Sequence, residues 1–250
     1  MSTKQVTPHL SGLMSVNEAN AGFFNHVMKT VDVLVDRTIG QERSLKSVLA
    51  LAERMGQIAD LATAELIKLH PEMSSIACAP GCSHCCRKLE IVTDAPTVFS
   101  LAFHARQGYS AAQFAAFEDR LMALESRPCV FLVEDRCSVY NARPLACRSF
   151  NAMHVDLCAA GRFFHLEGDD ERRPDNVDLW RLCVGAAIAD GVATGLERNG
   201  FDGRQLHLRS GLQRIFGTEG SVDLWLAGEP IFDGLYHGEW EPLAHESSQA

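Results

Sequence analysis

Apolar residues recur at helical spacing over two long stretches near the start of the chain. The first stretch runs from Asn17 to about Thr38 and is closed by Gly40, a residue that commonly ends helices. The second runs from about Glu42 to Leu69 and is stopped by Pro71. We therefore predict a helical hairpin whose apolar stripe packs against a core or a partner protein.

Helix-capping residues introduce two shorter helical patterns in the middle of the chain. Thr93 or Asp94 precedes a helix that has Pro96 in its first turn and extends to about Gln107. Ser110 precedes another, from Ala111 to about Glu125, with apolar residues on one side. Each pattern predicts an amphipathic helix.

The last third of the chain contains one long apolar pattern and two short ones. A helix is predicted from Asn176 to about Arg198, although Gly191 and Gly195 weaken the pattern. Shorter helices are expected at 203–216 and 221–227, and the charged stretch 166–175 is expected to be a solvated loop.

Two stretches rich in cysteine lack a clear period. Residues 74–92 are expected to form a loop, and residues 127–151 to be mostly irregular. Within the second, 130–133 and 137–140 predict two short strands across a turn at 134–136. The end segments, 1–16 and 242–250, are expected to be loosely attached or frayed.

These patterns predict a mainly α protein, in which irregular cysteine-rich loops gather on a metal centre and strands are few and short. The expected organisation has three parts: an N-terminal helical hairpin at 1–72, a cysteine-cluster domain at 73–165, and a C-terminal helical region at 166–250 that packs on it.

Composition narrows the class of protein. Of the 250 residues, 46% are hydrophobic and 22% are charged, which is typical of a folded globular chain. The net charge of −9 argues against a nucleic acid partner, which would require a basic face. The polar N-terminus argues against a secretory signal, and the longest apolar runs are far too short to span a bilayer, which argues against a membrane partner. We expect a cytoplasmic location, where thiols remain reduced.

Cysteine clustering is the strongest chemical signal in the chain. Four of the nine cysteines fall within nine residues, in the run Cys78-Ala-Pro-Gly-Cys82-Ser-His-Cys85-Cys86. Thiolates are soft ligands that hold zinc or iron–sulfur clusters, whereas the odd count and the adjacent pair argue against disulfides. The candidate metal ligands are Cys78, Cys82, Cys85, Cys86, Cys129, Cys137, Cys147 and Cys158.

Other residues near the cysteines have alternative interpretations. Arg143 and Arg148 are candidate cofactor-binding residues that could donate to a cluster sulfur, a backbone carbonyl or an anionic ligand. His84 could bind metal or act as a hydrogen-bond donor behind the ligands. Cys183 follows Trp180 on an apolar helical pattern and is interpreted as a buried packing residue.

The cysteine pattern resembles a known family. Cys78…Cys82-x-x-Cys85-Cys86 is followed by Pro128-Cys129-x-Phe131-Leu132 and by Cys137-x-Val139-Tyr140-x-x-Arg143-Pro144-x-x-Cys147-Arg148-x-Phe150. These motifs resemble the YkgJ-like cysteine-cluster family, also named CxxCxxCC, over about residues 75–160. The resemblance implies that the cysteines chelate zinc or iron. Ser83 stands where family members often have glycine, a difference that concerns loop geometry.

Three functions compete at this stage. The favoured one is a protein that holds an iron–sulfur cluster, [4Fe–4S] in type, in a redox or catalytic role. The alternative is a zinc-stabilised module that binds a protein partner through the N-terminal helices. The resemblance to flagellin lysine methylases adds a third, methyl transfer from S-adenosylmethionine. The spacing of Cys78, Cys82 and Cys85 also matches a radical S-adenosylmethionine motif, but the surrounding helical pattern lacks the strand–helix alternation of a βα barrel. The residues assign no substrate or catalytic group.

Overall fold

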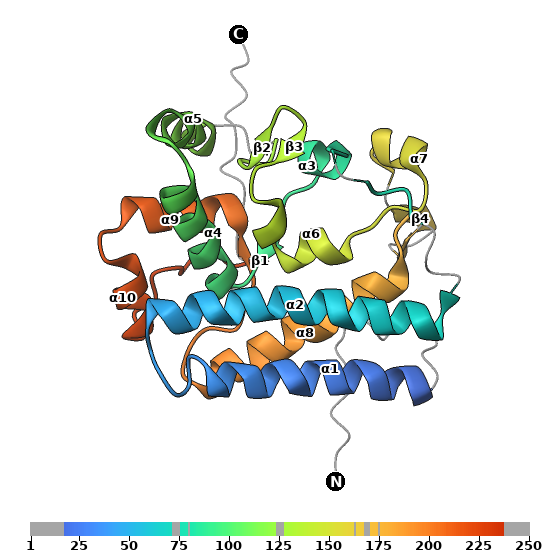
Figure 1. The fold of residues 1–250 in the computed structure, drawn as a ribbon, viewed down its shortest axis with the longest axis horizontal. Helices are drawn as coiled ribbons and strands as arrows, with labels where there is room; N and C mark the ends of the chain where they lie inside the picture. The colour runs from blue at the N-terminus through green and yellow to red at the C-terminus, as the bar shows by residue number, and fades with distance from the viewer. Residues whose placement is uncertain are drawn as a thin grey trace.

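The computed structural model describes residues 18–71, 76–79, 81–123, 128–162, 164–167, 171–174 and 176–237. The long helices are α1 (Glu18–Arg37), α2 (Leu45–Leu69), α4 (Ala95–Gly108), α5 (Ala111–Met122), α8 (Leu179–Arg198) and α9 (Leu208–Gly217). The short ones are α3 (His84–Lys88), the 3₁₀ turn η2 (Tyr140–Ala142), α6 (Leu145–Ser149), α7 (Val155–Ala159) and α10 (Ser221–Leu226). The predicted mainly α fold is confirmed (Figure 1).

Six short strands form three separate antiparallel pairs within the described residues. They pair as β1 (Val92–Thr93) with β6 (Leu206–His207), β2 (Leu132–Val133) with β3 (Arg136–Cys137), and β4 (Phe164–Glu167) with β5 (Glu171–Pro174). The first pair joins the residues before α4 to those before α9. Each strand pair therefore joins two loop segments by backbone hydrogen bonds, and the strands do not form a layer of their own.

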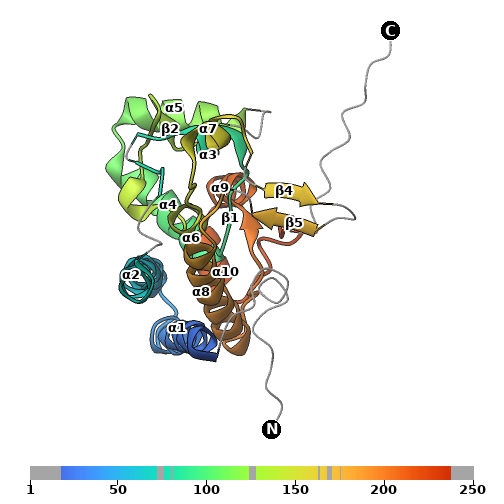
Figure 2. The same cartoon turned by 90° about the vertical axis from the view of Figure 1, so that its right-hand side faces the viewer.

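Helices α1, α2 and α8 form the base of the molecule, with α1 packed mainly against α8 (Figures 1 and 2). Two glycines of α8 permit this close approach. A Cβ atom on Gly191 would come within 2.9 Å of the Cβ of Val31, and one on Gly195 within 2.6 Å of the Cβ of Val35. The residues that weakened the helical pattern in the sequence are thus the ones that the packing requires.

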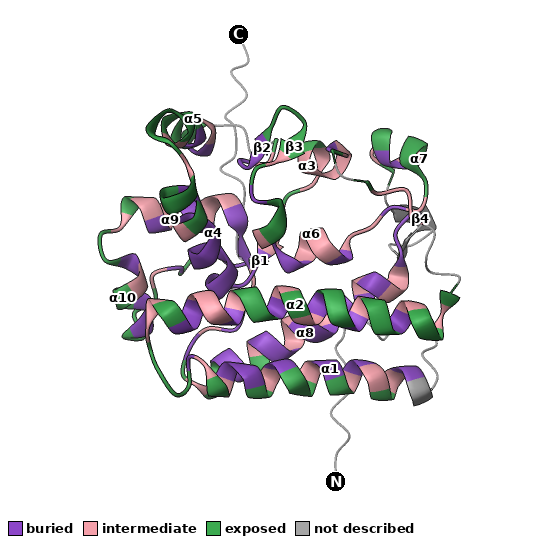
Figure 3. Cartoon of the chain, in the orientation of Figure 1, coloured by how far each residue is buried: buried purple, intermediate pink, exposed green. Residues whose placement is uncertain are grey.

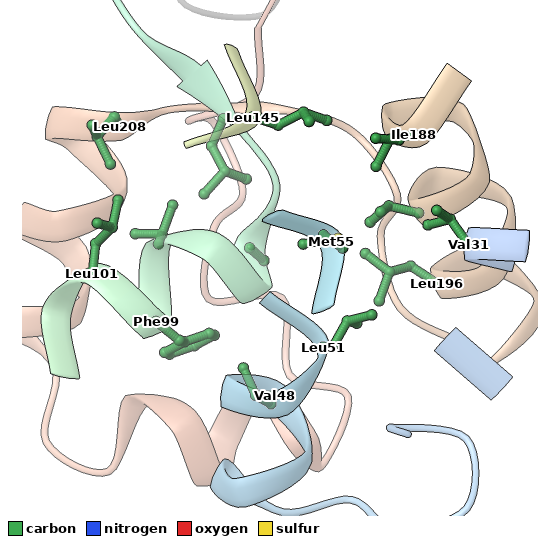
Figure 4. Packing of buried hydrophobic residues seen from close by; sticks show 14 of the residues in the cluster. Val31, Val48, Leu51, Met55, Phe99, Leu101, Leu145, Ile188, Leu196 and Leu208 are labelled. Carbon is green, nitrogen blue, oxygen red and sulfur yellow. The ribbon is translucent and has the colours of Figure 1, made fainter. Parts of the chain in front are cut away.

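One apolar core connects this base to the helices above it. Met55 of α2, Leu145 of α6, Leu196 of α8 and Phe99 of α4 all belong to the same buried cluster (Figure 4). Figure 3 shows the corresponding pattern, in which the long helices alternate between buried inner positions and exposed outer positions. The short helix α6 is thereby anchored from below by the core.

Helix α8 is the one helix in the described ranges that is long and apolar enough to cross a membrane. Its apolar residues, Val184, Ile188 and Val192 among them, are buried against the neighbouring helices. The apolar side chains of α8 thus pack in the interior of the fold.

Two predicted helix caps agree with the structure, and the starts of two other helices differ from the prediction. Asp94 accepts a hydrogen bond from Thr97 N at 2.8 Å, and Ser110 forms a reciprocal capping box with Gln113. Helix α8, predicted to start at Asn176, begins at Leu179, after its N-cap Asp178. The start of α9 is likewise displaced from residue 203 to Leu208, because residues 206–207 pair with β1.

The prediction of a loop at 166–175 is wrong for the residues of this stretch that the structure describes, 166–167 and 171–174. Phe164 pairs with Pro174, and Glu167 with Glu171, in the two-stranded β4–β5 ribbon that projects in Figure 2. Glu, Arg and Pro are poor strand formers, so their local preference concealed the pairing. The expectations for residues 1–16 and 242–250 fall outside the described residues.

Candidate metal centre

The three cysteine-bearing segments converge on the side of the molecule opposite α1. The first segment ends in α3, which carries Cys85 and Cys86; the second holds Cys129 and the β2–β3 hairpin, whose β3 ends at Cys137; the third holds α6 and α7, which carry Cys147 and Cys158. Figures 1 and 2 both place these elements together, with α6 between them and the helical base. The short helices α3, α6 and α7 lie where the sequence analysis expected irregular chain or defined no element.

Hydrogen bonds tie the first segment to the second. Cys129 N donates to Cys86 O at 2.8 Å, which brings a cysteine of each segment next to the other. Ser83 Oγ donates to Asp135 Oδ1 at 2.6 Å, and Arg87 forms an ion pair with the same carboxylate. These interactions, that of Ser83 first, lower the pKa of Asp135. Asp135 sits in the two-residue turn of the β2–β3 hairpin, so the hairpin is held against α3.

A second set of hydrogen bonds ties the first segment to the third. Ala77 N donates to Ala152 O at 2.8 Å, and Ala152 N donates to the Sγ atom of Cys78 at 3.1 Å. Such backbone donors to sulfur favour thiolate and are common around protein-bound metal clusters. The buried Asn176 side chain accepts from His154 N at 2.6 Å and so fixes the start of α7.

The sulfur atoms form two neighbourhoods that share Cys85. In one, Cys78, Cys82 and Cys158 lie within electrostatic range of one another. In the other, Cys129, Cys137 and Cys147 do so. The thiol of Cys85 lies within electrostatic range of members of both, and it is hydrogen-bonded to Cys86. The structure thus brings all eight candidate cysteines into one region, where they are free thiols.

Burial favours the neutral form of Cys129, Cys147 and Cys158 when no metal is bound. It raises the pKa of Cys129 and of Cys158 to about 11, and it raises the pKa of Cys147 well above its ordinary value. For Cys85 the largest cause is the hydrogen bond with Cys86, followed by burial. Neighbouring thiols add to each shift, since adjacent thiolates would repel. A bound metal cation reverses this preference, because it supplies the positive charge that stabilises thiolate.

Three cationic side chains lie near the sulfurs and lower the cost of thiolate charge. The charge of Arg143 favours the thiolate form of Cys78, Cys137 and Cys147, and that of Lys88 favours the thiolate form of Cys158. The third cation, Arg209, favours the thiolate form of Cys129. It comes from α9, which lies far from Cys129 in the sequence. The sequence carries no local signal for Arg209, so sequence reasoning did not identify it.

Arg209 also fixes the backbone that leads to Cys129. Its Nη1 atom donates to Leu121 O at 3.1 Å, and its Nη2 atom donates to Pro128 O at 3.1 Å. From the same helix, Gln213 donates to Leu121 O at 2.8 Å. These bonds satisfy carbonyl groups at the C-terminal end of α5 and hold Pro128, the residue before Cys129, against α9.

The remaining candidates lie in different places. Arg148 turns to α2, where it forms an ion pair with Asp60 at 2.9 Å, and its role as a cofactor-binding residue stays a prediction. His84 opens α3 next to the ligand candidates. Cys183 is 1% exposed in the core of α8, which confirms the interpretation as a packing residue.

The chemistry of this donor set suits a thiophilic metal. Eight free thiols, cations beside them and a backbone donor to sulfur are what zinc or an iron–sulfur cluster requires of a protein. Across the described part of the chain, no three His, Cys, Asp or Glu side chains are already arranged as a closed ligand set. The match between this site and a thiophilic metal therefore rests on the number and the chemistry of the cysteine side chains in this region.

Comparison with known proteins identifies the same segment. Residues 77–173 match the family model CxxCxxCC, described as "Putative zinc- or iron-chelating domain". The resemblance seen in the cysteine motifs is thereby confirmed, and it supports metal binding by this part of the chain. The curated proteins and the solved structures contain no significant match to the chain.

Proposed function

We propose that this protein holds an iron–sulfur cluster of the [4Fe–4S] type, in a redox or catalytic role. The observation that carries the proposal is the gathering of eight free thiols, Cys85 among them, with three cations beside them. A single tetrahedral zinc ion needs four thiolates, half of those present. A cluster with four thiolates carries excess negative charge, which Arg143, Lys88 and Arg209 would offset.

The cluster ligands would be drawn from Cys85 and the seven other candidate cysteines, and Cys183 would not take part. The bound cluster would supply one-electron transfer or a Lewis-acidic iron. The protein's own residues would orient the sulfurs through the ties at Asp135 and Ala152, and would exclude water from the buried side of α6. Reduced thiols are needed before assembly, which fits the expected cytoplasmic location.

The test is the metal and acid-labile sulfide content of protein purified without oxygen. We expect iron and sulfide in equal amounts, with the broad visible absorption of sulfide bound to iron. Cys147→Ser should lose both signals, whereas Cys183→Ala, a substitution of a buried cysteine outside the site, should keep them. Zinc without sulfide in the wild-type protein would overturn the proposal.

A second candidate function, a zinc-stabilised module that binds a protein partner, is favoured by the groove between α1 and α2. Val33 and Leu61 line it and are 43% and 67% exposed. The basic side chains Lys29, Arg37 and Arg54 also line it, in a chain whose net charge is −9. Apolar residues framed by positive charge suit an acidic amphipathic helix of another protein.

This candidate predicts a different experimental result. The protein would contain stoichiometric zinc without sulfide, and charge reversal at Arg37 and Arg54 would abolish capture of an acidic amphipathic peptide. Reversal at Arg106, on α4 away from the groove, would leave that capture unchanged. Capture that survives the reversal at Arg37 and Arg54 would remove this candidate.

A further inference from the structure

A large cleft lies beside the cysteine region, on the other side of α6. Its volume is about 740 Å³, within the range of small-molecule sites in proteins. Helix α2 forms its floor and runs beneath both α4 and α6 (Figure 1). The turn η2 and the following Arg143 close it on the side of the cysteines.

The charges that line the cleft leave one cation without an ionic partner. Arg148 and Asp60 neutralise each other in an ion pair at 2.9 Å. Glu53 accepts a hydrogen bond from Gln57 at 3.2 Å. Arg143 forms no ion pair with any residue in the described ranges, although it lines this cleft and a smaller one next to it.

The side chain of Arg143 is held in place but incompletely satisfied. Its guanidinium carbon lies 4.2 Å from the centre of the Tyr140 ring, so the ring fixes the plane of the group. Its Nε atom is buried and has no hydrogen-bond acceptor. A buried donor of this kind is costly, and an acceptor that enters from the cleft would remove the cost.

The cleft also offers apolar surface beside this cation. Phe103 of α4, Leu49 and Met55 of α2, and the Tyr140 ring all line it. Flat apolar groups fit such a surface, while the two acidic residues at its edge disfavour a ligand with two negative charges. Phosphate monoesters are largely doubly charged at neutral pH, whereas a carboxylate carries a single charge.

We propose that this cleft binds a small carboxylate that bears a flat apolar group, with Arg143 as the residue that accepts the carboxylate. The guanidinium of Arg143 forms charge-assisted hydrogen bonds to the ligand, and the apolar group lies along Phe103 and Met55. Because Arg143 also lies within electrostatic range of three cysteines, the ligand is bound next to the metal centre. The binding site itself does not depend on which metal is present.

The test compares probes that differ in charge. Binding of cinnamate, its neutral amide cinnamamide, and phenyl phosphate to the full-length protein is measured by ligand-observed NMR. We expect cinnamate to bind most tightly. A cleft that prefers the amide or the phosphate, or that binds none of the three, overturns the proposal.

Variants then locate the bound carboxylate. Arg143→Met should weaken cinnamate binding by about tenfold or more, since it removes a charge-assisted pair. Tyr140→Ala, a change at a half-exposed residue, should weaken it by a smaller factor. Arg106→Met is the matched control, because Arg106 also stacks on an aromatic ring, Phe216, outside this cleft.

The metal content of each variant is measured in parallel, because Arg143 lies near the cysteines. Weaker cinnamate binding in Tyr140→Ala, with unchanged metal content, supports a ligand site in the cleft. Cinnamate binding that persists in Arg143→Met overturns the proposal, whatever the metal content of that variant.

Discussion

Arg148 and Asp60 join the helix that carries Cys147 to the helical base. The Nη1 atom of Arg148 lies 3.0 and 2.9 Å from the two carboxylate oxygens of Asp60. Gly56, one turn earlier on α2, leaves room for the guanidinium, because a Cβ there would lie 3.1 Å from its Nη2 atom. The Arg148 side chain is only 13% exposed, so its charge depends on this partner.

Asp60→Asn should therefore lower the free energy of unfolding by about 1 kcal/mol, because it leaves a mostly buried guanidinium without its counter-ion. Urea denaturation measures the change. Glu65→Gln is the control on the same helix, since the Glu65–Lys68 pair is well exposed and should contribute almost nothing. Equal effects of the two substitutions would contradict this interpretation.

Gly185→Ala should push α6 away from α8 and loosen the metal centre. A Cβ atom at Gly185 would lie 2.5 Å from the Cβ of Ser149, two residues after Cys147. We expect a loss of about 1–3 kcal/mol of stability, as in other overpacked cores, together with lower metal retention. Gly22→Ala is the control, because a Cβ atom at Gly22 in α1 would have no neighbouring atom within 4 Å. This variant should retain the metal and be slightly more stable than the wild-type protein.

Arg209→Met should reduce metal retention without unfolding the protein. The substitution removes the hydrogen bonds to Leu121 and Pro128, and with them a cation near Cys129. Retained metal after dialysis against a chelator is the measurement. Arg214→Met is the matched control, since Arg214 on the same helix also donates to a backbone carbonyl, that of Ile231, away from the cysteines. Similar losses in both variants would exclude a specific role for Arg209.

Metal affinity should rise with pH. The pKa values of Cys129 and Cys158 are raised to about 11 in the metal-free protein, so both thiols hold their protons throughout the neutral range. Binding must release those protons, and each one released adds about one logarithmic unit of affinity per pH unit below that pKa. Competition of the protein with a chelator for zinc, between about pH 6.5 and pH 8.5, measures the slope. A pH-independent affinity would show that the bound thiols are already ionised when free.

The long helices could be predicted from the sequence because they obey local rules. Period and caps located α1, α2, α4 and α5, and Asp94 and Ser110 cap their helices as expected. The β4–β5 ribbon was missed because its pairing overrides the preferences of Glu, Arg and Pro. Gly191 and Gly195 counted against α8 because their reason, the approach of α1, lies far away in the sequence.

The candidate site was predictable only in part. Cysteine spacing identifies ligand candidates, since metal chemistry restricts which residues can serve. Spacing does not show that Cys85 lies between two groups of sulfurs, because that arrangement depends on tertiary ties such as Cys129 N to Cys86 O. Arg209 and the cleft beside Arg143 arise from packing between distant helices, for which one sequence has no local signal.

The pairing of α1 with α8 has a consequence for biosynthesis. Val31 and Gly191 touch although they are about 160 positions apart, and every candidate ligand from Cys78 to Cys158 is translated between them. At ordinary rates of synthesis, α8 is completed roughly 2–8 s after Cys158. During that interval α1 lacks its main partner and the thiols are already made. The nascent chain thus needs a reducing environment more than the finished protein does. It also needs a metal source that acts late, after α8 has been made.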